Sequence, residues 1–179
     1  MNIEKLALER LNRPALDEYV KSQKLGYNIV ADNLRSGQNI GSLFRTADAF
    51  ACDNIYLTGI SPIPPNKEVL KTALGATESV AWNYMEFNAD LITRLKADGV
   101  KIVVIEQTTH SIPLHEFIPD HEERYAIVLG NEVDGVSDDF IKNADLCIEI
   151  PQVGIKHSLN VSVCAGIVMW HMFSKLKLT

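Results

Sequence analysis

Three stretches of the chain combine glycines with polar side chains that are suited to holding a ligand. They are Asp32–Arg45, Gly130–Gly135 and Pro151–Asn160, and each directly follows an apolar run with the composition of a strand. Ligands of parallel α/β sheets lie at the carboxyl ends of the strands. The pattern therefore directs the search for a functional site to these three stretches.

Each stretch also has a simpler interpretation. Asn39 fits a cap for a helix over residues 40–50, and Arg45 fits an ordinary surface arginine. Ser158–Asn160 fits a turn and a helix cap before Val161–Gly166, whose small residues permit close packing against a ligand or another chain. The phosphate-binding patterns GxGxxG and GxxxxGK[ST] and the nucleophile pattern GxSxG are absent, so the sequence does not support those sites.

The histidines and cysteines form no recognisable metal site or nucleophile. Three histidines fall in loop sequence that contains prolines, at spacings that match no zinc motif, so we expect no bound metal. The cysteines lie in apolar surroundings and are expected to be inert core residues. These residues are His110, His115, His121, Cys52, Cys147 and Cys164.

The composition is that of one globular domain, which we predict over residues 1–179. Of the 179 residues, 46% are hydrophobic and 22% are charged. The chain opens on no basic region followed by an apolar run, and it contains no run of 18 apolar residues, so we predict neither a secretory signal nor a membrane span. The three cysteines are widely spaced without a CxxC pattern, which favours a cytoplasmic protein over a disulfide-stabilised one.

The net charge of −6 argues against a general nucleic-acid-binding protein, but the charge is unevenly distributed. Residues 1–75 carry nine basic and eight acidic side chains, whereas residues 76–179 carry eight basic and fifteen acidic ones. A surface that binds a polyanion is therefore expected in the first 75 residues. Its candidate cations are Lys21, Lys24, Arg35, Arg45, Lys67 and Lys71.

Strand-like runs alternate with helical patterns along most of the chain. Val103–Ile105 and Ala126–Leu129 are apolar at every position, as in strands that are covered on both faces. We therefore predict an α/β fold with a mostly parallel sheet and helices on both faces, preceded by a short helical extension over 1–27 that holds two short helices within 2–24. Ser61–Asn66 is expected to be a loop. Strands are predicted at 28–31, 55–57, 80–82, 102–105, 125–129 and 146–150, and helices at 40–50, 88–98, 137–143 and 159–173.

Three segments taken together resemble the SpoU/TrmH family of RNA ribose 2′-O-methyltransferases, within the SPOUT superfamily. They are Asn39–Phe50, Ile127–Gly135 and Ile150–Val163, and the resemblance covers about residues 28–173. The stretch Lys71–Ala76, expected to be a loop, is also similar to the family. Gln152 stands where the family usually has Met, Gly37-Gln38 stands where a Pro is common, and Ala51-Cys52 replaces a usual Gly. These departures leave the subfamily and the RNA target open.

The resemblance implies a deep trefoil knot in the C-terminal third of the chain, bound S-adenosylmethionine and a homodimer. By position, Gly130, Ile150 and Leu159 would contact the cofactor, largely through backbone groups, and Thr108 would line its adenosine side. Asn131 and Glu132 complete the predicted cofactor site, with Glu132 fixing the loop by accepting backbone N–H bonds.

The resemblance also implies the catalytic residues. Arg45 matches the family's essential arginine, Asn39 would orient Arg45 or the ribose, and Ser158 and Asn160 would complete a polar wall. Because a guanidinium stays protonated, two roles for Arg45 remain open. It either stabilises the developing 2′-oxyanion and grips a phosphate, or it organises the site while an RNA phosphate accepts the proton. Arg35, Lys67 and Lys71 are the predicted phosphate contacts.

The residues leave other classes of protein to be considered. A non-catalytic RNA-binding or cofactor-binding module on the same fold is one alternative, and a nucleotide-binding α/β enzyme that acts on small molecules is another. About 27 residues precede the first predicted strand, which is too few for a separate substrate-binding domain. This length favours tRNA over rRNA as the substrate.

Overall fold

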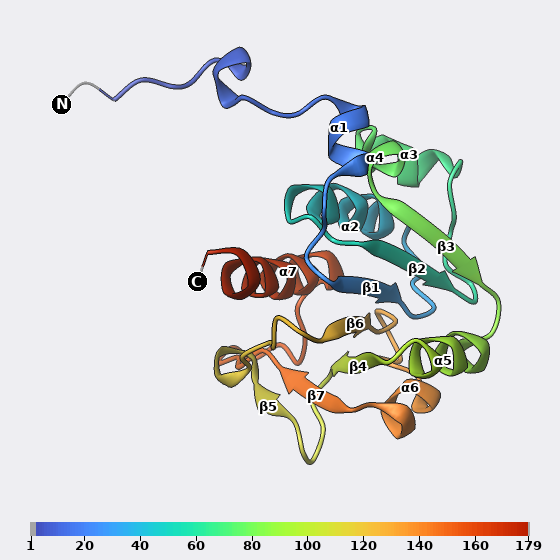
Figure 1. Ribbon diagram of the computed structural model, residues 1–179. Coiled ribbons are helices and arrows are strands. Elements are labelled where there is room, and N and C mark those ends of the chain that lie inside the picture. Colours follow the sequence, from blue (N-terminus) through green and yellow to red (C-terminus); the bar gives the residue numbers. More distant parts are fainter. Residues whose placement is uncertain (1–2, 179) are drawn as a thin grey trace.

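The predicted α/β fold is confirmed by the computed structural model, which describes residues 3–178. Within these residues, seven strands form one sheet in the order β3-β2-β1-β6-β4-β7-β5, and neighbouring strands run parallel (Figure 1). The strands are β1 (Tyr27–Ala31), β2 (Asn54–Thr58), β3 (Ala81–Met85), β4 (Val100–Ile105), β5 (Ile112–Pro113), β6 (Arg124–Leu129) and β7 (Leu146–Glu149).

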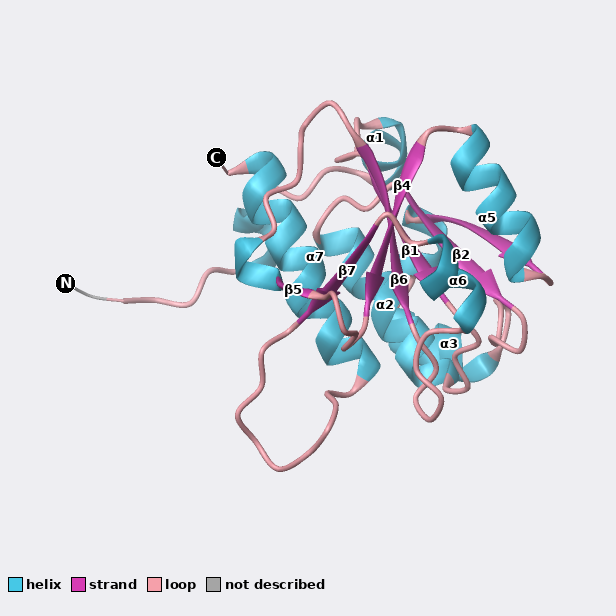
Figure 2. Ribbon diagram, turned by 90° about the horizontal axis from the view of Figure 1, so that it is seen from below, coloured by secondary structure: helices cyan, strands magenta, loops and turns pink. Residues whose placement is uncertain are grey.

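Helices cover both faces of the sheet, as the figures show (Figures 1 and 2). One face carries α2, α3, α4 and α7, and the other carries α5 and α6. The α-helices are α1 (Leu16–Lys21), α2 (Gly37–Ala49), α3 (Lys67–Ala73), α4 (Ala76–Ser79), α5 (Asn88–Ala97), α6 (Asp138–Asn143) and α7 (Val161–Lys177), and the 3-10 helices are η1 (Leu8–Leu11) and η2 (Leu114–Glu116). No helix within residues 3–178 is long and apolar enough to cross a membrane.

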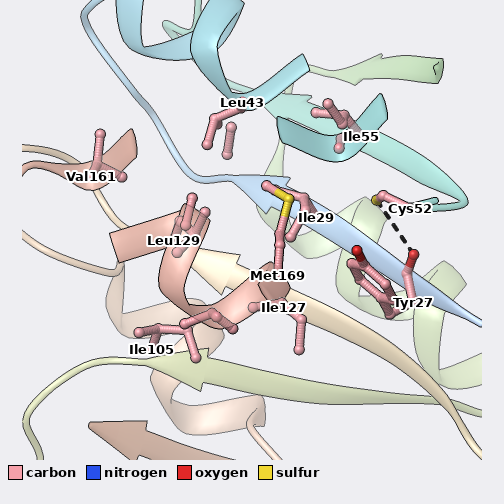
Figure 3. Close-up of a cluster of buried hydrophobic side chains, with 14 of the residues drawn as sticks. Tyr27, Ile29, Leu43, Cys52, Ile55, Ile105, Ile127, Leu129, Val161 and Met169 are labelled. Atoms are coloured by element: carbon pink, nitrogen blue, oxygen red, sulfur yellow. Dashed lines mark hydrogen bonds between the residues drawn. The ribbon is translucent and has the colours of Figure 1, made fainter. Parts of the chain in front are cut away.

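Two hydrophobic cores form because successive residues of a strand point to opposite faces. Ile29 and Ile127 lie in the core under α2 and α7, together with Met169 of α7 (Figure 3). Their neighbours Val30 and Val128 are also fully buried, but they lie in the core under α5 and α6. This double burial is the physical reason for the uninterrupted apolar runs in the sequence.

Near the C-terminus, the order of the strands in the sheet differs from their order in the sequence. Strand β6 lies between β1 and β4, β7 lies on the far side of β4, and α7 then returns to pack against α2. In Figure 2 the long loop after β7 swings out from the edge of the sheet before α7 begins. The trefoil knot and the single domain over 1–179 stay predictions, and residues 1, 2 and 179 lie outside the described residues.

Several predicted boundaries were wrong. Ser36 caps α2 by accepting the Asn39 N–H at 3.2 Å, so Asn39 lies inside the helix and is not its cap. The stretch 71–76, predicted as a loop, instead holds the end of α3 and the start of α4, with Asn66 capping α3. The short strand β5 was also missed, since two residues carry no periodic signal.

The N-terminal segment is drawn in blue in Figure 1, where residues 3–15 extend away from the body of the molecule and α1 lies beside α4. This segment holds two short helices within the range 2–24 where two were predicted, the 3-10 helix η1 and then α1, and α1 buries none of its residues.

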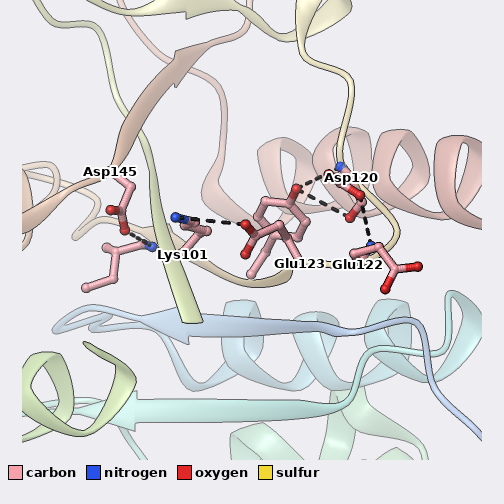
Figure 4. Close-up of polar contacts among 7 residues, drawn as sticks. Lys101, Asp120, Glu122, Glu123 and Asp145 are labelled. Carbon is pink, nitrogen blue, oxygen red and sulfur yellow. Dashed lines mark hydrogen bonds and ion pairs between the residues drawn. The ribbon is translucent and has the colours of Figure 1, made fainter. Parts of the chain in front are cut away.

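At the amino ends of the strands, polar contacts hold neighbouring segments together (Figure 4). The Asp145 carboxylate accepts the Ile102 N–H at 2.8 Å, which ties the start of β7 to β4. Lys101 lies 3.9 Å from the Glu123 carboxylate, an exposed ion pair of small energetic value. These contacts lie at the amino ends of the strands, whereas the three predicted functional stretches lie at the carboxyl ends.

The packing of α2 on α3 requires a glycine at position 41. A Cβ there would overlap the Thr72 hydroxyl and the Val69 carbonyl of α3. Helix propensity alone predicts that Gly41→Ala stabilises the protein by about 0.5–1 kcal/mol. We instead expect a loss of about 1–3 kcal/mol in the free energy of unfolding, because the helices are forced apart. Urea denaturation measures the change, and a variant as stable as the wild type contradicts this packing.

Candidate active site

A cavity of about 680 Å³ lies at the carboxyl ends of β4, β6 and β7. Its walls come from the ends of these strands, the glycine turn 130–135, the loop 150–160 and the first turn of α7. The volume falls in the range of sites for small molecules and cofactors, about 300–1,000 Å³. Its place at the ends of parallel strands is where such folds hold ligands.

The glycine turn after β6 is rigidly built. A Cβ at Gly130 would overlap the backbone of Gly135, so this position requires glycine. Asn131 and Gly135 exchange backbone hydrogen bonds of 2.9 and 3.0 Å across the turn. The Asn131 side chain accepts the Val133 N–H at 2.8 Å and donates to the Asn33 carbonyl at 2.6 Å. The turn therefore presents a fixed backbone to the cavity.

A chain of side-chain hydrogen bonds joins the three stretches that the sequence singled out. Asn39 of α2 donates to the Glu132 carboxylate at 3.0 Å. Asn160 in turn donates to the Asn39 side-chain oxygen at 3.3 Å. The Asn160 oxygen also caps α7 by accepting the Ser162 N–H at 2.9 Å. The start of α2, the glycine turn and the start of α7 are thus held in one arrangement.

Glu132 is the carboxylate at the centre of this arrangement. It accepts the backbone N–H groups of Arg35 at 3.0 Å and Ser36 at 3.3 Å, besides the Asn39 amide. Burial alone would raise the pKa of the Glu132 carboxyl, but these hydrogen bonds outweigh it and lower the pKa below its ordinary value. The loop after β1 is therefore bound to the glycine turn by an ionised carboxylate.

The structure brings most of the predicted site residues to the cavity wall. Helix α2 holds Asn39 behind the wall, through its bond to Glu132. Both side-chain groups of Asn39 are used in the chain of hydrogen bonds, so its place in the fold is that of a positioning residue. The predicted residues that line the cavity are Gly130, Asn131, Glu132, Ile150, Ser158, Leu159 and Asn160.

Thr108 is not among the residues that line the cavity, and its place on the adenosine side of the cofactor stays a prediction. It lies in a turn in which its hydroxyl accepts the His110 N–H at 3.3 Å. The wall near β4 is instead formed by Ile105, Glu106 and Gln107. Glu106 was not among the predicted site residues, although an acidic residue directly after a buried strand is a usable signal for a site at the strand ends.

Arg45 lies apart from the cavity wall of its own chain. It is exposed on α2 and makes no hydrogen bond or ion pair with the described residues. Because a helix turns by about 100° per residue, the six residues from Asn39 leave roughly 120° between the two side chains. Within the described residues Asn39 makes no hydrogen bond with Arg45, and its role in orienting Arg45 or the ribose stays a prediction.

The predicted phosphate contacts lie on exposed surface. Arg35 follows β1, next to the loop that Glu132 holds, and its side chain is exposed. Lys67 and Lys71 are exposed one turn apart on α3, which packs against α2. The predicted cations thus come from two segments on either side of α2 in the sequence.

Two of the three cysteines, Cys52 and Cys164, lack nucleophilic character. Burial raises the pKa of the Cys52 thiol to about 12. Burial, with a smaller contribution from the nearby Glu106 charge, raises the pKa of Cys164 to about 11. Both thiols are therefore protonated at neutral pH. Among residues 3–178, no group of three or more His, Cys, Asp or Glu side chains is placed to hold a metal ion.

An open parallel α/β sheet with a glycine turn and a polar cavity at its strand ends defines a class of ligand-binding enzyme folds. The chain matches the SpoU rRNA methylase family model over residues 26–170. It is 31% identical over 163 residues to a Staphylococcus aureus protein provisionally named a TrmH family tRNA/rRNA methyltransferase, covering 89% of this chain. The chain belongs to the SpoU rRNA methylase family, and it spans 64% of the length of that relative.

Solved structures share the fold. The AdoMet-bound rRNA methyltransferase of Sinorhizobium meliloti has a TM-score of 0.77 at 24% identity, over 84% of this chain and 56% of that one. The TrmH/SpoU tRNA modifying enzyme of A. aeolicus has a TM-score of 0.74 at 26% identity, over 96% of this chain and 89% of that one. The sheet and its covering helices therefore follow the architecture of known methyltransferases.

The hydrogen bonds to Glu132 make its titration a direct probe of the site. We expect the pKa of Glu132, followed by carboxyl ¹³C NMR, to lie below the ordinary value and to rise in Asn39→Ala, which removes one donor. Ser42→Ala, on the same helix without contact to Glu132, is the control.

The contribution of the Glu132 carboxylate to stability is present above the unfolded-state pKa and is lost as the pH falls through the folded-state pKa. Equal pKa values in wild type and Asn39→Ala would contradict the assignment.

Proposed function

We propose that this chain is an S-adenosylmethionine-dependent RNA methyltransferase that methylates a ribose 2′-hydroxyl. The main observation in support of this proposal is the chain of hydrogen bonds from Glu132 through Asn39 to Asn160. It brings the three segments that resemble the family together at one cavity. The names of the relatives, which include tRNA/rRNA methyltransferases, support RNA as the substrate. We propose tRNA as the preferred RNA, with rRNA as the alternative, and a cytoplasmic location.

The cavity residues fit the cofactor. Its size suits a nucleoside-bearing ligand, and the Gly130 turn offers a fixed backbone on which no Cβ intrudes. The Sinorhizobium meliloti rRNA methyltransferase, which shares this fold, has AdoMet bound, and this supports the same cofactor here. Gly130, Ile150 and Leu159 would hold it, with Asn131 and Glu132 stabilising the turn. When bound, this cofactor supplies an activated methyl group to the site.

The chemistry requires a ribose hydroxyl to be positioned and to lose its proton. A guanidinium is charged at all physiological pH values, so Arg45 serves to stabilise the developing 2′-oxyanion and to grip the neighbouring phosphate. In the alternative role, Arg45 organises the site while an RNA phosphate accepts the proton. Ser158 and Asn160 form the polar wall against which the ribose lies. Alignment of the hydroxyl with the methyl group supplies much of the rate.

A homodimer supplies the cation that each cavity lacks. Four carboxylate side chains line the cavity, whereas the described residues lining it include no Lys or Arg. Arg45 is exposed on α2, which packs against α7, and α7 exposes a stripe formed by Val163, Ile167 and Trp170. An exposed apolar stripe beside this helix is suited to a second copy of the chain. We infer that the Arg45 of one chain serves the cavity of the other.

Arg45→Ala is expected to abolish methyl transfer while leaving the cofactor dissociation constant nearly unchanged. The side chain acts on the RNA in the transition state and makes no contact with the cavity of its own chain. The assay incubates the protein with labelled S-adenosylmethionine and bulk RNA and then tests whether the label survives alkaline hydrolysis, as a 2′-O-methyl linkage must. More than about a tenth of wild-type activity in Arg45→Ala removes its assigned role.

Mixing two inactive variants tests the dimer in the same assay. A hybrid of an Arg45→Ala chain and an Asn160→Ala chain keeps one complete site, built from the Arg45 of one chain and the cavity of the other. After exchange of subunits, about a quarter of the sites are intact, so a similar fraction of activity should return. No recovery, with the hybrid shown to form, contradicts a site shared between chains.

The phosphate contacts predict a steep dependence of RNA binding on salt. Replacing Lys67 and Lys71 by Ala together should weaken binding and lower the slope of log K against log salt by roughly 0.7–0.9 per lost phosphate contact. The matched control replaces Lys96 and Lys142, on α5 and α6 of the opposite face, and should leave the slope unchanged. Gel shifts across a salt series measure both, and an unchanged slope in the first variant contradicts the proposed RNA surface.

A further inference from the structure

Glu106 is a cavity carboxylate to which the proposed reaction assigns no role. It directly follows β4, is half-buried and forms part of the cavity wall. One carboxylate oxygen accepts the Val136 N–H at 3.2 Å, and the other accepts the Gln107 N–H at 2.9 Å. The side chain therefore spans from the end of β4 to the end of the glycine turn.

Glu106 has hydrogen-bonding capacity left for a ligand. An ionised carboxylate offers about four lone-pair sites, and the described contacts of Glu106 use one on each oxygen. Glu132 differs, because its oxygens take three donors from the start of α2 and the loop before it. Of these two carboxylates, Glu106 is the one with an acceptor site on each oxygen for a group inside the cavity.

The sheet places Glu106 beside the glycine turn. Strands β4 and β6 are parallel neighbours, with Ile105 paired to Leu129. Glu106 and Gly130 therefore leave the sheet side by side as the next residues of their strands. A glycine turn on one strand and a carboxylate at the end of another is the arrangement with which nucleotide-binding α/β sheets hold a ribose hydroxyl.

Gly135 makes the close approach of Glu106 possible. Its backbone has a φ of +73°, which favours glycine, and a Cβ there would lie 2.5 Å from a Glu106 oxygen. A larger residue would push the carboxylate away from the turn. Gly135 and the Glu106 carboxylate therefore lie against each other in the wall of the cavity.

We propose that Glu106 binds the ribose 2′,3′-diol of the cofactor, with each carboxylate oxygen accepting one hydroxyl. This inference rests on the proposed function, because it takes the ligand of the cavity to be an adenosine-bearing cofactor. It makes Glu106 the residue that selects a ribonucleoside in this cavity. Two hydroxyls that donate to a charged acceptor account for a strong preference over a ligand that lacks them.

The test measures binding and needs no catalysis. Isothermal titration calorimetry compares S-adenosylhomocysteine with its 2′,3′-dideoxy form on wild type, Glu106→Gln and Glu149→Gln. Glu149 is the matched control, a second cavity carboxylate, on β7, which accepts the Ser111 hydroxyl at 3.0 Å. We expect wild type and Glu149→Gln to prefer the diol by about tenfold or more, and Glu106→Gln to lose most of that preference.

The outcomes separate this inference from the proposed function. If wild type binds S-adenosylhomocysteine without preferring the diol, the role of Glu106 is wrong and the cofactor assignment stands. An unchanged preference in Glu106→Gln, or its loss in Glu149→Gln instead, also overturns the role. If wild type binds neither ligand, the cofactor assignment fails and this inference fails with it. The wild-type comparison does not depend on any variant folding, and circular dichroism checks the two variants.

Discussion

The site depends on one set of hydrogen bonds, those that the Glu132 carboxylate and the Asn39 and Asn160 amides form with one another. The residues are far apart in the sequence, and each belongs to a segment that has its own reason to be rigid. Asn160 caps a long helix, Glu132 extends from a closed glycine turn, and Asn39 lies in the first turn of α2. Because each contact joins segments that are distant in the sequence, the site holds its shape only while the sheet keeps the three segments in register.

The sheet supplies that register through its two buried faces. Strands β1, β4 and β6 are covered on both sides, so a slip of one residue would exchange whole sets of side chains between the cores. The loops at the carboxyl ends are thereby fixed relative to one another, and the cavity forms between them. Glu106 and Gly130 follow the paired residues of β4 and β6, so the pairing of these strands fixes the position of Glu106 in the cavity wall.

In the proposed function, the charge of the cavity makes one chain an incomplete site for RNA. Its wall carries carboxylates, which suit a cationic group on a cofactor but repel a phosphate backbone. The cations predicted to contact phosphate lie on exposed segments outside the wall, in the first 75 residues. The proposed function accordingly places the cofactor in the cavity and the RNA on the surface, and it makes the dimer part of the proposed mechanism.

The sequence by itself determined the fold class, the main strands and the segments that form the cavity, because fully apolar runs and glycine-containing turns are local signals. It placed Gly130, Ser158 and Asn160 at strand ends and helix starts, where the structure has them. Only the tertiary structure decided that Asn39 faces Glu132 while Arg45 faces outward, that Thr108 lies outside the wall and that Glu106 lies within it. Those outcomes depend on helix rotation and strand pairing between distant segments, which no local pattern encodes.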